Sequence, residues 1–222
     1  MIPPEADAEF VACMEDVLDV YERPYDPKVP VVNLDEQPVQ LVKETRQPLD
    51  VEPGHARRYD HEYERAGTAC VFLATEALAG WREVSVRPQR TAVDWAQELA
   101  ALLEGRYARA EKVIGICDQL NTHTIASLYK AFPPEKARHL AQRLEIHHTP
   151  KHGSWLNIAE CELSVLTRQC LRTRTGSVAA LVRKVMPWAR DRNARQRGVH
   201  WHFRTKDARI KLKRLYPEVQ LS

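Results

Sequence analysis

The sequence lacks the features that define several large classes of protein. Its five cysteines form no C-x-x-C pair, so reduced thiols are expected, and neither a disulfide framework nor a thiolate zinc site is indicated. No apolar run approaches the roughly 20 residues that span a bilayer, and no signal-peptide pattern opens the chain. Internal repeats and low-complexity segments are absent as well. We therefore expect a cytoplasmic protein that has no membrane partner.

The chain contains enough apolar material for a substantial core. Of its 222 residues, 44% are hydrophobic, which suits one large domain or one domain with an appendage. Residues 5–21 carry apolar side chains at helical spacing and predict an amphipathic helix with its acids outward. Residues 43–67 are polar and contain prolines, and we interpret them as a long excursion.

Strand and helix patterns alternate along the rest of the chain. A hairpin is expected over residues 69–75 and 81–87, joined through Gly80, and Thr91 is expected to cap the helix that follows. Residues 113–117 and 144–148 are short apolar segments. Further helices are predicted over residues 154–172, 176–195 and 206–216. A hairpin followed by alternating strands and helices favours an α/β domain with a mixed sheet.

Charge is unevenly distributed, although the formal net charge is only +3. The first twenty residues carry six acids and no base, whereas the segment 183–214 carries twelve bases, two acids and interleaved aromatic residues. Such a segment can bind a DNA backbone by releasing its counterions, or it can be a plain solvated helical surface. The DNA contacts predicted within it are Arg195, Arg197, Arg204, Lys206, Arg209, Lys211 and Lys213.

Two apolar runs each lead into an aspartate. "VVNLD" ends in Asp35 and "VIGICD" ends in Asp118, as expected for central strands covered on both faces. If these strands are adjacent and parallel, both acids lie at the sheet edge where α/β proteins place their sites. Two such carboxylates repel each other, and a divalent cation between them would remove the conflict. The alternative is that either acid only caps the turn after its strand.

A site for a hard cation needs a third carboxylate. The helix predicted from Ser154 offers Glu160 and Glu162, which fall in the two gaps between its apolar faces. Either side chain could therefore be held at a partly buried edge, and the periodicity does not choose between them.

Three segments, "VVNLDEQP", "ICDQLNTHT" and "TPKHGSWLNIAECELSVL", resemble in this order the catalytic segments of the DDE transposases. The likeness is to the bacterial insertion-sequence branch related to mariner elements, and it covers most of the chain from about residue 28. It implies an α/β, RNase H-like mixed sheet with helices on both faces. It also implies metal-dependent DNA strand cleavage and strand transfer, with water or a DNA 3′-hydroxyl as the nucleophile.

The resemblance implies that Asp35, Asp118 and Glu160 are the catalytic and metal-binding acids. Glu160 is chosen because the acid of the family follows the pattern N-x-x-E, which Asn157 begins. The implied cofactor is a pair of Mg²⁺ or Mn²⁺ ions roughly 3.5 to 4 Å apart, since these ions prefer oxygen ligands.

Polar residues near the acids are expected to support the metal ligands or to face DNA, although a plain turn role suits those after Asp118 equally well. These residues are Gln119, Asn121, His123 and Asn157. The family usually has asparagine directly after the second aspartate. Gln119 keeps the amide but moves it outward by one methylene.

The histidines offer a rival interpretation as a zinc site. His147, His148 and His152 lie close together, and Glu160 could be a fourth ligand. Pro150 disfavours the helix that the H-x-x-x-H spacing needs, and no thiolate is placed to help. We expect instead that Lys151 and His152 approach a DNA phosphate near the acids.

The resemblance divides the chain into an N-terminal helix and linker (1–27), the catalytic domain (28–198) and a basic helical tail (199–222). Such transposases usually carry helix-turn-helix DNA-binding modules ahead of the catalytic domain, and only about 28 residues precede the first strand here. We therefore expect a catalytic half without that domain, which forms a homodimer and acts on transposon ends and target DNA. The alternative is a catalytically silent, transposase-derived fragment that binds DNA or oligomerises.

Overall fold

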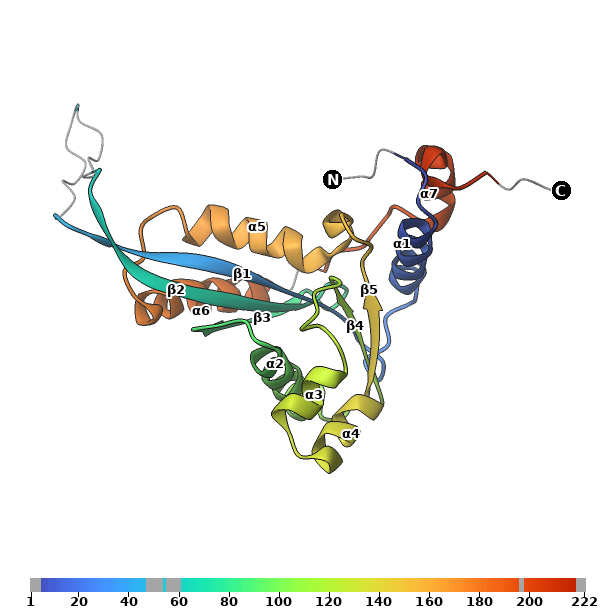
Figure 1. Cartoon of the computed structure of the whole chain (residues 1–222), viewed down its shortest axis with the longest axis horizontal. Coiled ribbons are helices and arrows are strands. Elements are labelled where there is room, and N and C mark those ends of the chain that lie inside the picture. The colour runs from blue at the N-terminus through green and yellow to red at the C-terminus, as the bar shows by residue number, and fades with distance from the viewer. Residues whose placement is uncertain (1–4, 47–53, 55–60, 196–197, 219–222) are drawn as a thin grey trace.

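A five-stranded mixed sheet forms the centre of the protein, in the order β3-β2-β1-β4-β5 (Figure 1). The computed structural model describes residues 5–46, 54, 61–195 and 198–218. β1 pairs antiparallel with β2, and β2 pairs antiparallel with β3, whereas β4 and β5 run parallel to β1. The predicted mixed sheet is confirmed. Its strands are β1 (Val31–Glu44), β2 (Tyr63–Glu76), β3 (Trp81–Arg87), β4 (Val113–Cys117) and β5 (Leu144–His148).

Helices cover both faces of this sheet, as expected. Side chains alternate along β2, so that Phe72 faces α2, α3 and α4, whereas Val71 faces α5 and α6. At the other end of the sheet, Ile114 and Ile116 of β4 pack beneath α1 and α7. The helices are α1 (Ala8–Tyr21), α2 (Ala92–Glu104), α3 (Ala126–Ala131), α4 (Pro134–Gln142), α5 (Ile158–Cys170), α6 (Val178–Arg195) and α7 (Thr205–Lys211), with short 3₁₀ turns η1 (Ser154–Leu156) and η2 (Lys213–Leu215).

The expected excursion over residues 43–67 is wrong at both of its ends. β1 continues to Glu44 and β2 begins at Tyr63, so the two strands form a long antiparallel ribbon (Figure 1). Pairing of each strand with the other satisfies the backbone of these polar stretches, which the composition alone did not reveal. Residues 47–53 and 55–60 lie outside the described residues.

The same ribbon corrects the position of Asp35. This residue does not end its strand, because β1 continues beyond it along β2. Pairing of β1 with β4 is short, and its last pair is Asn33 with Ile116. Asp35 therefore lies just beyond the point where β1 leaves β4, and this position opens it to the sheet edge.

Local signals predicted several element ends correctly. Gly80 has a φ of 65°, as the tight turn between β2 and β3 requires. Thr91 caps α2 through a reciprocal capping box with Asp94.

Two predicted helices differ from the structure. The helix predicted over 154–172 is divided at Asn157, which ends η1 and caps α5. The helix predicted over 206–216 ends at Lys211, with η2 after it.

The N-terminal helix and the C-terminal segment pack together. The amide of Asp7 donates to the carbonyl of Leu215 at 3.0 Å, and both guanidinium nitrogens Nε and Nη2 of Arg209 lie 2.8 Å from the carboxylate of Glu15. α1 and α7 thus share one apolar core with β4. Within the described residues, no helix has both the length and the apolar character that crossing a membrane requires.

Candidate active site

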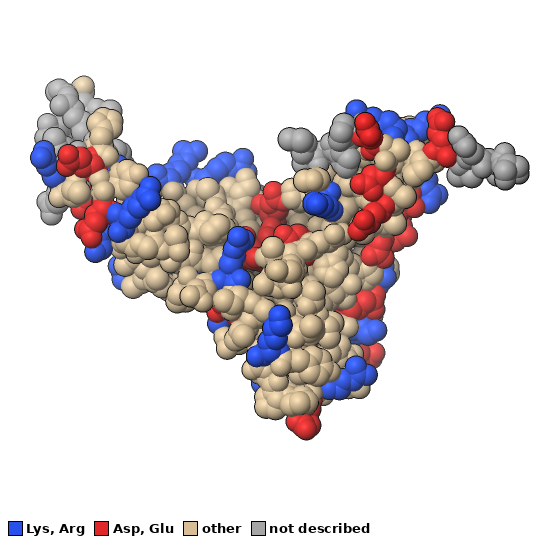
Figure 2. Space-filling view, in the orientation of Figure 1, with Lys and Arg blue, Asp and Glu red and all other residues tan. Residues whose placement is uncertain are grey.

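One open cavity of about 520 Å³ receives all three predicted acids. Asp35 comes from β1, Asp118 follows β4, and Glu160 lies in the first turn of α5. Figure 2 shows acidic side chains gathered in a hollow at the centre of the molecular face. The expected meeting of two strands holds, because β1 and β4 are adjacent and parallel. The catalytic and metal-binding roles of the three residues stay predictions.

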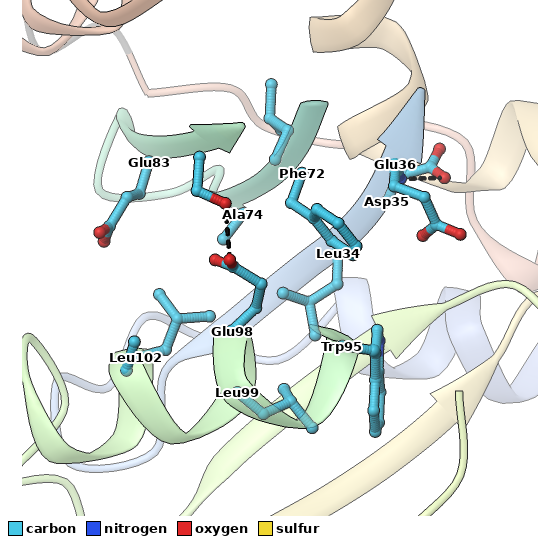
Figure 3. A pocket seen from close by; sticks show the side chains of 13 residues that line it. Leu34, Asp35, Glu36, Phe72, Ala74, Glu83, Trp95, Glu98, Leu99 and Leu102 are labelled. Atoms are coloured by element: carbon cyan, nitrogen blue, oxygen red, sulfur yellow. Dashed lines mark hydrogen bonds between the residues drawn. The ribbon is translucent and has the colours of Figure 1, made fainter. Parts of the chain in front are cut away.

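The carboxyl group of Asp35 has a strongly raised pKa. The amide of Glu36 donates to Asp35 Oδ1 at 2.8 Å, and Oδ2 has no hydrogen-bond partner among the described residues (Figure 3). Burial above all, together with the negative charges of Glu36, Asp118 and Glu160, raises the pKa of Asp35 to about 7, although the hydrogen bond from Glu36 lowers it. The site therefore holds more negative charge than its own groups neutralise.

Asp118 is held in place by Leu120 and His123. Its Oδ1 accepts a hydrogen bond of 3.1 Å from the amide of Leu120, so Asp118 also caps the turn that follows β4. The same oxygen lies 2.6 Å from Nδ1 of His123, although the angle is not that of a hydrogen bond. Contact with His123 is the main reason why the pKa of Asp118 is lowered. Both contacts use Oδ1, and Oδ2 has no partner among the described residues.

His123 joins two of the acidic side chains. It is 1% exposed, its Nε2 lies 3.0 Å from Glu36 Oε2, and its ring stacks on Trp95 at a centroid distance of 5.3 Å. Burial opposes the charge of this ring, but Asp118, Cys117 and Glu36 together raise the pKa of His123 to about 12. A cationic imidazole at neutral pH thus bridges β1 and the loop after β4.

Asn157 positions the start of α5. It is 2% exposed, its Oδ1 accepts from the amide of Ala159 at 3.0 Å, and its Nδ2 donates to the carbonyl of Leu34 at 3.0 Å. The side chain therefore caps α5 and fastens it to β1 beside Asp35. Glu160, three residues later, is exposed and faces the cavity.

The two glutamates of α5 have different surroundings. Glu162 is 6% exposed and faces away from the cavity, with its carboxylate 2.7 and 3.0 Å from Arg192 and 3.2 Å from Arg82. Arg82 is itself 3% exposed, so Glu162 and Arg82 form a buried ion pair that the half-buried Arg192 completes. Glu162 is a structural residue, and Glu160 is the acid that shares the cavity with Asp35 and Asp118.

Other predicted supporting residues do not reach the cavity. Gln119 is exposed and its Nε2 donates to Cys13 Sγ of α1 at 3.6 Å, whereas Asn121 is exposed beside it. Neither side chain lines the cavity. Of the four predicted supporting residues, the structure places His123 and Asn157 in contact with the acids or their elements.

The rival zinc cluster does not assemble. His147 contacts Asp16 at 2.6 Å and Glu145 at 3.0 Å, and His148 donates to the carbonyl of His123 at 2.9 Å. His152 lies in a turn with a φ of 67° rather than in a helix. Among residues 5–46, 54, 61–195 and 198–218, no three His, Cys, Asp or Glu side chains are close enough to hold a metal ion, and this holds for the three acids of the cavity too.

The basic C-terminal segment is partly neutralised. Arg209 is paired with Glu15 of α1, Arg195 lies 2.9 Å from Asp191, and Lys211 lies 5.7 Å from the ring centre of Phe203. Glu15 of α1 and Asp191 of α6 thus neutralise part of the positive charge that was predicted to bind DNA. Lys151 and His152 are exposed on the turn after β5. Arg204, Lys206 and Lys213 are exposed in the C-terminal segment, and Arg197 lies outside the described residues.

The cavity is also lined by polar residues that the sequence did not predict as part of the site. They are Gln37 of β1 and Ser164, Thr167 and Arg168 of α5. The signal that could have found the last of these is a polar stripe at helical spacing from Glu160.

A second, much smaller cavity lies between β1 and α2, around Leu34, Trp95 and Glu98 (Figure 3). Its volume of about 20 Å³ is that of a single water site, so it does not compete as a ligand site.

Comparison with known proteins agrees with this arrangement. Residues 30–181 match the family described as DDE superfamily endonuclease. No curated protein matches the chain. Among solved structures, the mariner Mos1 paired end complex with Mg is 16% identical, with a TM-score of 0.58, and covers 98% of this chain and 66% of that chain.

Two further structures show the same likeness. The Mos1 paired end complex with Mn is 16% identical with a TM-score of 0.56, covering 88% of this chain and 60% of that chain. The Mos1 strand transfer complex is 16% identical with a TM-score of 0.55, covering 86% of this chain and 56% of that chain. The chain thus spans 56–66% of the length of these Mos1 chains and shares their RNase H-like fold. Because the matching family segment covers most of its length, the chain belongs to the DDE superfamily endonucleases.

Proposed function

We propose that this chain is a transposase catalytic domain that cleaves and joins DNA strands by metal-dependent phosphoryl transfer. The observation that carries the proposal is the placement of Asp35, Asp118 and Glu160 around one open cavity. Membership of the DDE superfamily endonucleases supports nuclease chemistry. The Mos1 structures with the same fold are a paired end complex and a strand transfer complex, which supports transposition as the setting.

The carboxylate oxygens of the three acids suit divalent cations in kind, and their side chains would have to approach one another to hold them. Burial and the surrounding carboxylates raise the pKa of Asp35 to about 7, and a bound cation would remove the repulsion that contributes to this shift. Oδ2 of Asp35 and Oδ2 of Asp118 are both available as ligands. The exposed Glu160 side chain would have to turn toward them. Bound Mg²⁺ or Mn²⁺ would activate the attacking water or 3′-hydroxyl and stabilise the charge on the leaving oxygen.

The protein residues would hold this arrangement in place. His123 holds Oδ1 of Asp118 and is itself braced by Glu36, so the orientation of Asp118 is determined before any ligand arrives. Asn157 fastens α5 to β1, which sets the separation between Glu160 and Asp35. Positioning of this kind is the main contribution that a protein makes to phosphoryl transfer.

The partners proposed are transposon-end DNA, target DNA and a second copy of the chain. The element would belong to the bacterial insertion-sequence branch related to mariner, as the three sequence segments suggest. The chain spans 56–66% of the length of the Mos1 chains, and we assign recognition of transposon ends to none of its residues. Strand cleavage by the chain alone should therefore be slow and indifferent to sequence.

Nicking of supercoiled plasmid in Mn²⁺ tests this proposal. The unchanged chain should nick plasmid of random sequence, Asp35→Ala should not, and Glu135→Ala on α4 is the control, since that acid is exposed and far from the cavity lining. Equal nicking by all three proteins would identify a contaminating nuclease. No nicking by any of them, in Mn²⁺ and low salt, would favour the catalytically silent DNA-binding or oligomerisation fragment.

A further inference from the structure

We infer that the α5 end of the cavity is a DNA-phosphate site, formed by Gln37, Ser164 and Arg168, which holds the strand beside the three acids. The inference deepens the proposed function, because it rests on DNA as the substrate. It assigns a binding role to three side chains for which the sequence suggested none.

The two ends of the cavity differ in chemistry. The end formed by Asp35, Asp118 and Glu160 offers carboxylate oxygens, which can only accept hydrogen bonds when ionised. The other end offers hydrogen-bond donors, a guanidinium from Arg168 and a hydroxyl from Ser164. A cation fits the first set and a phosphate oxygen fits the second.

The geometry of α5 places these donors in line with the catalytic acid. Ser164 and Arg168 follow Glu160 at intervals of four residues, so the three side chains form one stripe along the helix. Eight residues of helix rise about 12 Å. Since one strand of duplex DNA advances about 3.4 Å per nucleotide, Arg168 would meet a phosphate roughly three or four nucleotides from the reacting one.

A hydrogen bond orients Gln37 for the same purpose. The hydroxyl of Thr167 donates to Gln37 Oε1 at 2.9 Å and ties α5 to β1. With its oxygen engaged, the amide of Gln37 has its Nε2 donors left, and these have no partner among the described residues. β1 therefore also presents hydrogen-bond donors to the cavity, through Gln37.

Arg168 differs from three other arginines, each of which is paired with a glutamate. Arg82 and Arg192 share the carboxylate of Glu162, and Arg174 lies 2.6 Å from Glu44. In the described part of the chain Arg168 is exposed and forms no ion pair. Figure 2 shows basic side chains along the α5 side of the acidic hollow. The helix dipole of α5 also stabilises the positive charge of Arg168, because Arg168 lies in the last turn. The dipole does not account for the presence of hydrogen-bond donors from Gln37 and Ser164 in the same cavity.

Binding of a short random-sequence DNA duplex, measured by fluorescence anisotropy in EDTA, tests the site without any chemistry. Arg168→Ala should weaken binding about fivefold to tenfold and reduce the slope of log K against log salt by about 1, as loss of one phosphate contact predicts. Gln37→Ala should weaken binding about twofold to threefold. The matched control is Arg138→Ala on α4, an exposed arginine away from the cavity, which should change neither quantity.

The double variant locates the contact. If Gln37 and Arg168 hold the same phosphate, the combined substitution should weaken binding by less than the product of the two single effects. Full multiplication of the effects would show separate contacts and overturn the shared site. Wild-type affinity and salt slope in Arg168→Ala would overturn the inference altogether, as would a change confined to the melting temperature, which would assign Arg168 to the helix dipole.

These outcomes are separable from the proposed function. Asp35→Ala should keep DNA binding while losing plasmid nicking. If the unchanged chain does not nick but Arg168→Ala still weakens binding, the catalytic proposal fails and the phosphate site stands. If nicking depends on Asp35 while Arg168→Ala binds like the unchanged chain, only the phosphate site fails.

Discussion

The side-chain nitrogen Nδ2 of Asn157 lies 3.0 Å from the carbonyl oxygen of Leu34, to which it donates a hydrogen bond. This contact joins the cap of α5 to the residue before Asp35, so one buried amide sets the spacing of two acids. The link makes the cavity depend on a residue that is not itself an acid.

Loss of the Asn157 side chain should therefore affect both stability and the site. Asn157→Ala should lower the free energy of unfolding by about 2 kcal/mol, since a helix cap and a buried hydrogen bond are removed together. Urea denaturation measures the change. Asn121→Ala is the control, because that side chain is exposed, and a loss of the same size there would contradict the assignment.

The two glutamates of α5 should respond in opposite ways. Glu162→Gln should lower the free energy of unfolding by about 3 to 5 kcal/mol, because it leaves the buried Arg82 without its carboxylate. Glu160→Gln should leave stability nearly unchanged and abolish plasmid nicking. Thermal unfolding and the nicking assay, applied to both variants, check the pair. Nicking that survives Glu160→Gln but not a folded Glu162→Gln would reverse the assignment.

Divalent cations should bind the chain weakly in the absence of DNA, because substrate phosphate normally completes their coordination. Titration calorimetry with Mn²⁺ should detect this binding in the unchanged chain and lose most of it in Asp118→Asn. Equal binding by both proteins would remove Asp118 from the metal ligands.

The raised pKa of Asp35 predicts a pH dependence of metal-free stability. The pKa is about 7 in the folded protein against a usual value of 3.8, so the folded state binds more protons than the unfolded state between these values. The stabilising contribution of protonated Asp35 is therefore complete below about pH 4 and is lost as pH rises toward 7. Asp35→Asn should flatten this part of the profile in urea denaturation, and an unchanged profile would contradict the shift.

The ion pair between Glu15 and Arg209 should restrain nonspecific DNA binding by the C-terminal segment. Glu15→Gln should strengthen duplex binding at low salt and steepen its salt dependence, because it frees Arg209 and removes a carboxylate beside it. Glu111→Gln, which frees Lys28 elsewhere on the surface, is the matched control. An equal gain in both variants would mean that the effect reflects net charge and not the position of Arg209.

Local patterns in the sequence were enough for much of the fold. Apolar runs before Asp35 and Asp118 predicted two central strands, and Thr91 with Asp94 predicted the start of α2. These features depend on neighbours within a few residues, where side-chain spacing and capping act directly. The N-x-x-E pattern that Asn157 begins predicted Glu160 as the third acid through resemblance, and the structure places this residue at the cavity.

Contacts between distant segments decided the rest. Periodicity left Glu160 and Glu162 equivalent, and only Arg82 and Arg192, far away in the chain, show which of them is buried. The positive charge of the C-terminal segment predicted that Arg209 contacts DNA. In the folded chain Arg209 instead pairs with Glu15, which lies near the N-terminal end of the sequence. The length of the β1–β2 ribbon was hidden for the same reason, because hydrogen bonding to a partner strand stabilises polar residues that have little strand preference of their own.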